Sequence, residues 1–167
     1  EYEAQYPGIH MLKGPGKGPG PARNMGLRSA KGDYIVFADA DDYLPDVDIF
    51  RKYISMAEQT GADIVVSNYA RLWENRVLPA VKHETFALCS PYSEEFRFRG
   101  FFSVGTLSYV WGKFYRSEFL KKYQIIFGNI SYAEDKLFNM ECYICDAKYV
   151  FLEDTGYIYR KNDTSVS

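Results

Sequence analysis

At 167 residues the chain suits one domain, and a hydrophobic fraction of 47% is enough to bury a single core. Its 20 basic and 22 acidic residues leave a formal net charge of -2 and no basic patch, which argues against a nucleic-acid partner. Three cysteines favour a reducing compartment, and no apolar run approaches the roughly 20 residues that span a bilayer. We expect a cytoplasmic globular domain without a transmembrane segment, and leave peripheral association with the inner face of the membrane open.

The first half of the chain alternates helical and strand patterns, which is typical of an α/β sheet. Gly and Pro alternate through residues 13–21 and predict an exposed loop before a helix. The apolar run 34–38 is typical of a strand buried on both faces of a largely parallel sheet. In chain order we expect a helix over 1–6, a strand over 9–12, a helix over 21–30, a strand over 34–38, a helix over 45–59 closed by Gly61, and a strand over 64–66.

The second half has a looser pattern. Ser131 and Glu134 have capping-box spacing at the start of a helix, in which Leu137, Met140 and Ile144 share one face. In chain order we expect a strand over 70–77, an irregular stretch to about residue 90, a short helix within 91–98, helices over 117–123 and 131–145, and strands over 149–152 and 157–159.

An acidic turn follows the apolar run 34–38 directly. Asp39, Asp41 and Asp42 are so close in sequence that their charges repel unless a cation or strong donors stabilise them. Mg²⁺ and Mn²⁺ prefer oxygen ligands and often take one or two carboxylates together with substrate phosphates. Ligand sites in open α/β sheets lie at the carboxyl ends of strands, so the turn predicts a metal-assisted phosphate site. A solvated acidic turn that caps the following helix is the simpler alternative.

Several other sites can be excluded from spacing. An EF-hand fails because Leu44 and Phe50 stand where its loop needs Gly and Glu. The Gly-rich loop contains neither a dinucleotide-binding fingerprint nor a Walker motif. The cysteine pair of the 131–145 helix has no second pair at a zinc-like spacing, so we expect reduced cysteines without bound zinc. The cysteines are Cys89, Cys142 and Cys145.

Two adjoining runs of sequence resemble the inverting glycosyltransferases of family 2. The first is Ala22-Arg-Asn-Met-Gly-Leu27, and the second is Ala30-Lys-Gly-Asp-Tyr-Ile35, which leads into the Asp39-Ala-Asp-Asp42 turn. The resemblance continues through Trp111-Gly-Lys-Phe-Tyr-Arg116, Glu134-Asp135, and Tyr157-Ile-Tyr-Arg-Lys-Asn162 with Ser165. It implies an α/β fold of the GT-A type, with a mixed, mainly parallel sheet flanked by helices. Family members begin with a strand, a helix and a second strand that have no counterpart here, so we expect the fold to be incomplete at its N-terminus.

The resemblance also implies roles on the donor side. Asp41 would bind the Mn²⁺ or Mg²⁺ ion that bridges the donor diphosphate. Asp39 would contact the donor ribose or share the metal, and Asp42 is a weaker candidate. Arg23, near the start of a helix, would face the phosphate or the base of a nucleoside-diphosphate sugar. A surface arginine without a ligand is an equally acceptable interpretation of Arg23.

On the acceptor side, the resemblance makes Asp135 the catalytic base that takes a proton from the acceptor hydroxyl. Trp111, Lys113 and Glu134 would line the side of the site that receives a carbohydrate or lipid-linked acceptor. Each has an alternative: a buried Trp beside a lysine whose stem packs on apolar surface, a Glu that caps its own helix, and for Asp135 a charge that favours the helix N-terminus.

We therefore interpret residues 1–167 as one catalytic domain. Residues 1–69 would form the remainder of the nucleotide-sugar-binding part, and residues 70–167 the acceptor-side part. The predicted function is inverting, metal-assisted sugar transfer in polysaccharide biosynthesis.

Two alternative functions stay open. A strand that ends in Asp-x-Asp also opens phosphohydrolases of the haloacid-dehalogenase class, although Tyr43 stands where that class has Thr or Val. A sugar-binding remnant without catalytic activity is the other.

Overall fold

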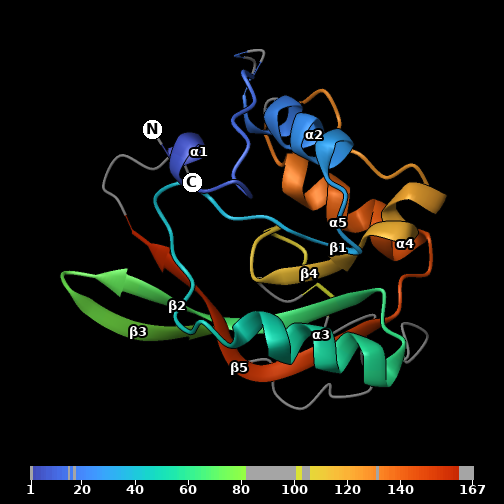
Figure 1. Cartoon of the computed structure of the whole chain (residues 1–167). Coiled ribbons are helices and arrows are strands. Elements are labelled where there is room, and N and C mark those ends of the chain that lie inside the picture. Colours follow the sequence, from blue (N-terminus) through green and yellow to red (C-terminus); the bar gives the residue numbers. More distant parts are fainter. Residues whose placement is uncertain are drawn as a thin grey trace.

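A five-stranded mixed sheet organises the computed structural model, which describes residues 2–14, 16, 18–81, 101–102, 106–130 and 132–161 (Figure 1). The strands are β1 (Tyr34–Val36), β2 (Ile64–Trp73), β3 (Arg76–Val81), β4 (Lys113–Arg116) and β5 (Tyr149–Arg160). Their order is β1, β4, β2, β3, and β5 also pairs with β2. The long β2 therefore joins all parts of the sheet.

The directions of the strands differ from the sequence-based expectation. In the described part of the chain, β1–β4, β4–β2 and β2–β3 are antiparallel, and β2–β5 is parallel. The sheet is mixed and flanked by helices, as expected, but it is not mainly parallel. β1 is three residues long, pairs only with β4 among the described strands, and its residues are half-buried. An apolar run alone does not reveal strand direction, which explains the error.

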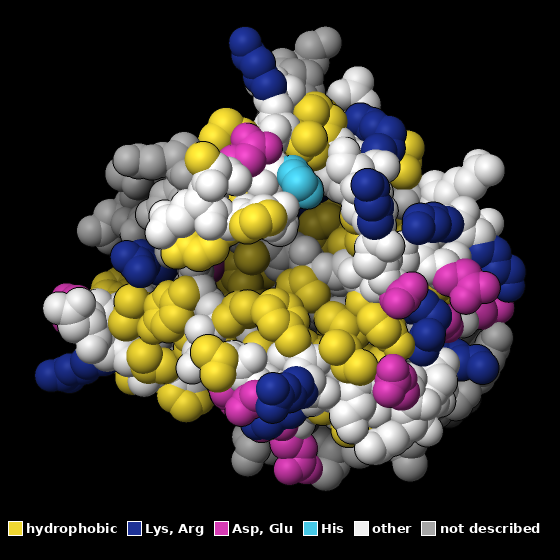
Figure 2. Space-filling view, in the orientation of Figure 1, with side chains coloured by type: hydrophobic (Ala, Val, Ile, Leu, Met, Phe, Trp, Pro, Cys, Tyr) yellow, Lys and Arg dark blue, Asp and Glu magenta, His cyan; other side chains and the backbone are white. Residues whose placement is uncertain are grey.

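Different helices cover the two faces of the sheet (Figure 1), and in the same orientation hydrophobic side chains gather across the middle of the molecular surface (Figure 2). The helices are α1 (Tyr2–Gln5), α2 (Pro19–Ser29), α3 (Ile49–Thr60), α4 (Ser117–Lys122) and α5 (Glu134–Ile144). Successive β2 side chains point to opposite faces. Val65 packs in the cluster that contains the buried face of α3, whereas Ile64 and Val66 pack in the cluster that contains residues of α2, α4 and α5.

The helices and strands of the first half follow the expected order, but several of their bounds differ. α3 begins at Ile49 and not at residue 45, and the expected strand 64–66 is the start of the longer β2, which also contains the first residues of the expected strand 70–77. α3 ends at Gly61, whose φ of 66° is the left-handed conformation expected at a helix C-terminus. The stretch 9–12 is not a strand, and Met11 is 74% exposed. The expected strand 70–77 is interrupted by Glu74 and Asn75, whose φ angles of 44° and 61° form the turn between β2 and β3. Neither residue is a glycine, so the turn signal was weak.

The helix that carries the candidate base begins later than the capping-box pattern predicted. α5 starts at Glu134 with Ala133 as its N-cap, in a left-handed conformation and without a side-chain cap. The capping-box prediction is therefore wrong. The predicted apolar face is wrong as well, because Leu137 and Ile144 are exposed. The buried face instead consists of Phe138, Asn139 and Cys142.

The closing elements of the chain are confirmed in position. α4 agrees with the expected helix, and the two expected closing strands are halves of the single strand β5. No helix in the described ranges has the length and apolar character needed to cross a membrane. The predictions for Cys89, Ser131, Asn162, Ser165, and the short helix within 91–98 lie outside the described residues.

Candidate active site

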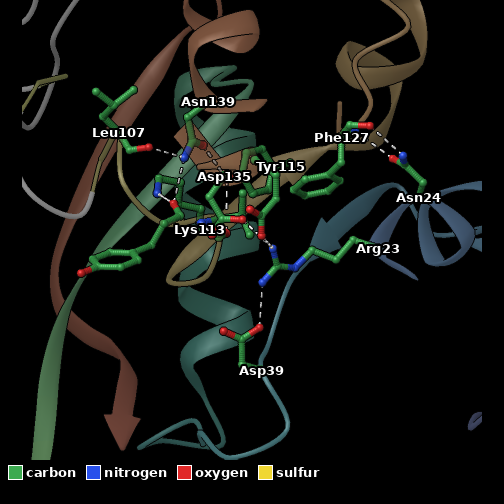
Figure 3. Close-up of polar contacts among 12 residues, drawn as sticks. Arg23, Asn24, Asp39, Leu107, Lys113, Tyr115, Phe127, Asp135 and Asn139 are labelled. Carbon is green, nitrogen blue, oxygen red and sulfur yellow. Dashed lines mark hydrogen bonds and ion pairs between the residues drawn. The ribbon is translucent and has the colours of Figure 1, made fainter. Parts of the chain in front are cut away.

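Arg23 joins three carboxylates that come from distant parts of the sequence (Figure 3). Its Nη2 donates to Asp39 Oδ1 at 2.9 Å, just beyond the carboxyl end of β1. Its Nη1 donates to Asp135 Oδ1 at 2.5 Å and to Glu134 Oε1 at 3.3 Å, both in the first turn of α5. The structure therefore brings together four of the residues that the sequence singled out.

The approach of α2 to α5 explains this geometry. α2 begins at Pro19, two residues earlier than expected, so Arg23 lies one turn into the helix. Gly20 is buried at the contact, where an added Cβ would lie 3.4 Å from Phe127 Cβ and 3.6 Å from Glu134 Cγ. These distances are ordinary van der Waals contact, so the space at Gly20 admits a methyl group but is closed on the side of Phe127 and Glu134. The Arg23 guanidinium also lies over the Phe127 ring, 5.4 Å from its centroid.

Burial and charge act in opposite directions in this cluster. The Arg23 and Asp135 side chains are each 15% exposed. Burial lowers the pKa of Arg23, but the nearby carboxylates, Asp135 foremost, outweigh it and leave the pKa raised. Burial raises the pKa of Asp135, and Arg23 and the Val110 N–H oppose this only in part. A raised carboxyl pKa makes Asp135 a better proton acceptor than an exposed aspartate.

Tyr157, on β5, fixes the acidic turn. Its hydroxyl donates to Asp42 Oδ2 at 2.7 Å and accepts the Asp39 N–H at 3.0 Å. The Arg160 N–H donates to the second carboxylate oxygen of Asp42 at 2.7 Å. Burial raises the pKa of Asp42, although these bonds oppose the shift. Asp42 thus fastens the turn to β5, whereas Asp41 is exposed.

The oxygen donors of the turn fit a hard divalent cation that is shared with a substrate. Asp41 is exposed and the Asp39 side chain is 39% exposed, so carboxylate oxygens face solvent at the end of β1. Within the described ranges, no group of three or more acidic, His or Cys residues is arranged to hold a metal by itself. Mg²⁺ and Mn²⁺ need only one or two carboxylates when phosphates supply further ligands.

Trp111 and Lys113 are buried, which limits how they could act on an acceptor. The Trp111 ring stacks between Tyr109 and Tyr157, with centroids 4.2 and 4.6 Å away, and is 5% exposed. Lys113 is 1% exposed, and burial lowers its pKa to about 7 although Asp135 opposes the shift. Neither side chain presents a surface to a bulky ligand. Trp111 instead packs among tyrosine rings, and Lys113 lies close enough to Asp135 for their charges to interact.

Sequence reasoning gave no role to two polar residues that the site depends on. In the sequence, Tyr157 is only part of a family motif, and its position along a strand gives no sign of a bond to the acidic turn. Asn139 carries no motif, and the one available signal is its spacing: it lies four residues after Asp135 and hence on the same side of α5. A pocket of about 620 Å³ lies elsewhere, beside Asp33, Arg116 and Lys121, and contains none of the predicted site residues.

Comparison with known proteins agrees with this fold. The model of the family described as "Glycosyl transferase family 2" matches residues 1–132. The uncharacterized glycosyltransferase EpsJ of Bacillus subtilis is 30% identical over 95% of this chain and 46% of its own length. TarS of Staphylococcus aureus, a poly(ribitol-phosphate) β-N-acetylglucosaminyltransferase, is 26% identical over 90% of this chain and 25% of its own length.

A solved structure extends the similarity to three dimensions. The crystal structure of S. aureus TarS 1–349 in complex with UDP-GlcNAc superposes with a TM-score of 0.71 at 25% identity, over 89% of this chain and 40% of that chain. The chain thus spans less than half the length of these relatives. The fold is GT-A-like, as in that TarS structure. The chain belongs to glycosyl transferase family 2.

Proposed function

We propose that the complete protein transfers a sugar from a nucleoside-diphosphate sugar to an acceptor hydroxyl, with inversion at the anomeric carbon and with the help of Mn²⁺ or Mg²⁺. The observation that supports this most is the meeting of Asp39, Arg23 and Asp135 in one ion-paired cluster. A donor-side carboxylate, a cation for a phosphate and a buried base are the groups that a single displacement needs in one place.

In the proposed step, Asp135 accepts the proton of the acceptor hydroxyl. The hydroxyl oxygen forms the new bond to the anomeric carbon, and the bond from that carbon to the diphosphate oxygen breaks. The nucleoside diphosphate leaves with the electron pair. Asp135 Oδ1 accepts from Arg23 and Oδ2 accepts from the Val110 N–H at 3.2 Å. Each carboxylate oxygen has two lone pairs, so both bonds still leave capacity for a proton.

The residues on the donor side would act through their charges on the diphosphate of the donor. Asp41 and Asp39 would hold the divalent cation, which would neutralise the diphosphate as it leaves. Arg23 would add a second positive group beside the same carboxylates. TarS was crystallised with UDP-GlcNAc, which makes UDP-sugars the first donors to test. We propose a carbohydrate, a polyol-phosphate polymer or a lipid-linked saccharide as the acceptor class, and the inner face of the membrane as a place where the protein meets it.

Calorimetry with a panel of nucleoside diphosphates, with and without Mn²⁺, tests the donor half of the proposal. We expect the complete protein to bind one diphosphate in the presence of Mn²⁺ and to bind it at least about tenfold more weakly without the ion. Asp41→Asn should abolish the difference, and Asp48→Asn, which changes an exposed carboxylate beyond the turn, is the matched control. Equal affinity with and without metal would overturn the metal-assisted mechanism.

The phosphohydrolase interpretation is not favoured. It requires the first aspartate of the turn to be a nucleophile, but Asp39 is ion-paired with Arg23. Membership in glycosyl transferase family 2 gives no support to that class.

A further inference from the structure

A short backbone segment, residues 107–110, lies directly before β4 and beside the candidate base (Figure 3). Asn139 Nδ2 donates to the carbonyl oxygens of Leu107 at 2.8 Å and Tyr109 at 3.0 Å. Lys113 Nζ donates to the same Tyr109 carbonyl. One amide and one ammonium group thus fix the backbone of this segment from α5 and β4.

The end of the segment continues to Asp135. The Val110 N–H donates to Asp135 Oδ2, while the Val110 carbonyl accepts from the Tyr115 hydroxyl at 3.2 Å. The Tyr115 hydroxyl also lies 3.0 Å from Asn139 Oδ1. The Val110 carbonyl is therefore bound by the buried Tyr115 hydroxyl, and the Val110 N–H in turn binds the carboxylate of Asp135.

The side chains that hold the segment are almost completely buried. Asn139 and Lys113 are each 1% exposed, and the Asn139 neighbours on the same helix face, Phe138 and Cys142, are fully buried. Burying an amide and an ammonium costs free energy unless both are bonded, and apolar residues of similar volume would fill the same space without that cost. The hydrogen bonds to the Leu107 and Tyr109 carbonyls offset part of this cost and at the same time hold those backbone groups.

We propose that Asn139 and Lys113 are positioning residues for Asp135, which act by holding residues 107–110 so that the Val110 N–H orients the Asp135 carboxylate. This rests on the proposed role of Asp135 as the base. A carboxylate accepts a proton efficiently only within hydrogen-bond reach of the hydroxyl, and displacements of about 1 Å can lower a rate about 100-fold. Arg23 binds the other oxygen, so loss of the Val110 bond would let the carboxylate turn toward Arg23.

Two variants of the complete protein test the proposal: Asn139→Leu and Lys113→Met. Asn68→Leu is the matched control, because Asn68 is also a buried asparagine that donates to a backbone carbonyl, Glu153 O at 2.8 Å, outside the network around Asp135. One readout is hydrogen exchange of the Val110 amide, measured by NMR without ligand. The other is release of UDP from UDP-GlcNAc with Mn²⁺, resolved into kcat and KM for the donor.

In Asn139→Leu and Lys113→Met we expect Val110 exchange to be at least about tenfold faster and kcat to fall by about 10-fold to 100-fold, with KM for the donor within about twofold of wild type. Asn68→Leu should lower stability and change neither readout. Unchanged Val110 exchange and kcat in both test variants would overturn the proposal. If the wild type itself releases no nucleoside diphosphate from any of a panel of nucleoside-diphosphate sugars, the proposed function fails, while Val110 exchange still decides the positioning role.

A more conservative substitution, Tyr115→Phe, keeps the test decisive if Asn139→Leu does not fold. Tyr115→Phe removes only the hydroxyl that binds the Val110 carbonyl and leaves the ring in place. We expect faster Val110 exchange and a smaller fall in kcat. Wild-type values for both in Tyr115→Phe would count against the proposal.

Discussion

Arg23→Met is the substitution that should reveal most about how the site is held together. Methionine keeps an unbranched apolar stem but removes the guanidinium, which lies over the Phe127 ring and is the only cation bonded to Asp39, Glu134 and Asp135 within the described part of the chain. Three carboxylates from two elements are then left without their common partner. The substitution therefore tests whether the cluster is a structural as well as a functional unit.

The size of the expected loss of stability follows from how deeply the ion pairs of Arg23 are buried. Removing one partner of a fully buried ion pair typically costs roughly 3–5 kcal/mol. The Arg23, Glu134 and Asp135 side chains are 15% exposed, whereas Asp39 is 39% exposed and contributes little because solvent screens it. We therefore expect Arg23→Met to lower the free energy of unfolding by about 2–3 kcal/mol at pH 7.

The cost should also depend on pH. Burial raises the pKa of Asp135 in the folded state, and Arg23 opposes that rise. Without Arg23 the pKa of Asp135 in the folded state rises further. The loss of stability relative to the wild type therefore grows as the pH rises from the folded-state pKa of the wild type to that of the variant. Below the ordinary aspartate pKa of about 3.9, the carboxyl is protonated in both folded and unfolded states and this part of the cost disappears.

Urea unfolding at pH 7 and pH 4 measures both effects, provided that the m-value stays unchanged. Arg28→Met is the control, because Arg28 is exposed in the last turn of the same helix and should contribute less than about 1 kcal/mol through the helix dipole. If Arg23→Met costs no more than Arg28→Met, or costs the same at both pH values, the cluster does not stabilise the junction of α2 and α5 as argued.

Three further predictions concern residues around the site. Gly156→Ala should lower the free energy of unfolding by about 1–3 kcal/mol, because the added Cβ would overlap Ser67 and the Tyr53 hydroxyl. Thermal unfolding measures this loss, and Gly8→Ala is the control because a Cβ at Gly8 meets no atom within 4 Å. Tyr157→Phe should weaken donor binding in calorimetry because the acidic turn loses its bonds to β5, and unchanged affinity would refute that link. Between pH 7 and about 10.4, unfolding of the wild type should take up the proton that folded Lys113 has released, so stability rises with pH. Lys113→Met should remove that rise in urea titrations, and an unchanged rise would assign it to another group.

The sequence predicted the elements whose signals are local. α3 shows an apolar periodicity closed by Gly61, and α4 begins and ends close to the expected residues. Asp39 and Asp135 were placed correctly at a strand end and in a first helical turn. Each of these positions is determined by a few neighbouring residues, and such patterns are visible without knowledge of the fold.

What the sequence did not predict depends on contacts between distant segments. The pairing of β1 with β4 joins residues about 80 positions apart, and nothing in the apolar run of β1 specifies its direction. The bond between Tyr157 and Asp42 likewise exists only because β5 returns beside the turn. The family resemblance placed Lys113 on the acceptor side, and only the folded structure shows the backbone carbonyl of Tyr109 to which it donates.

The role of Arg23 illustrates the same limit. Its position near a helix start suggested a phosphate or base contact, and the family resemblance pointed the same way. The structure places three carboxylates around it instead, from the turn after β1 and from α5. A donor would have to compete with or share these ion pairs, which no pattern within α2 reveals.

The most direct test of the proposed function is the turnover of Asp135→Asn in the complete protein, with a donor that the wild type uses and with Mn²⁺ present. Asparagine keeps the size of the side chain but does not accept a proton at neutral pH. The proposal predicts a fall in kcat by a factor of roughly 10² to 10⁴, with donor affinity close to that of the wild type. Wild-type turnover in Asp135→Asn, with the chemical step rate-limiting, would contradict the assignment of Asp135 as the base.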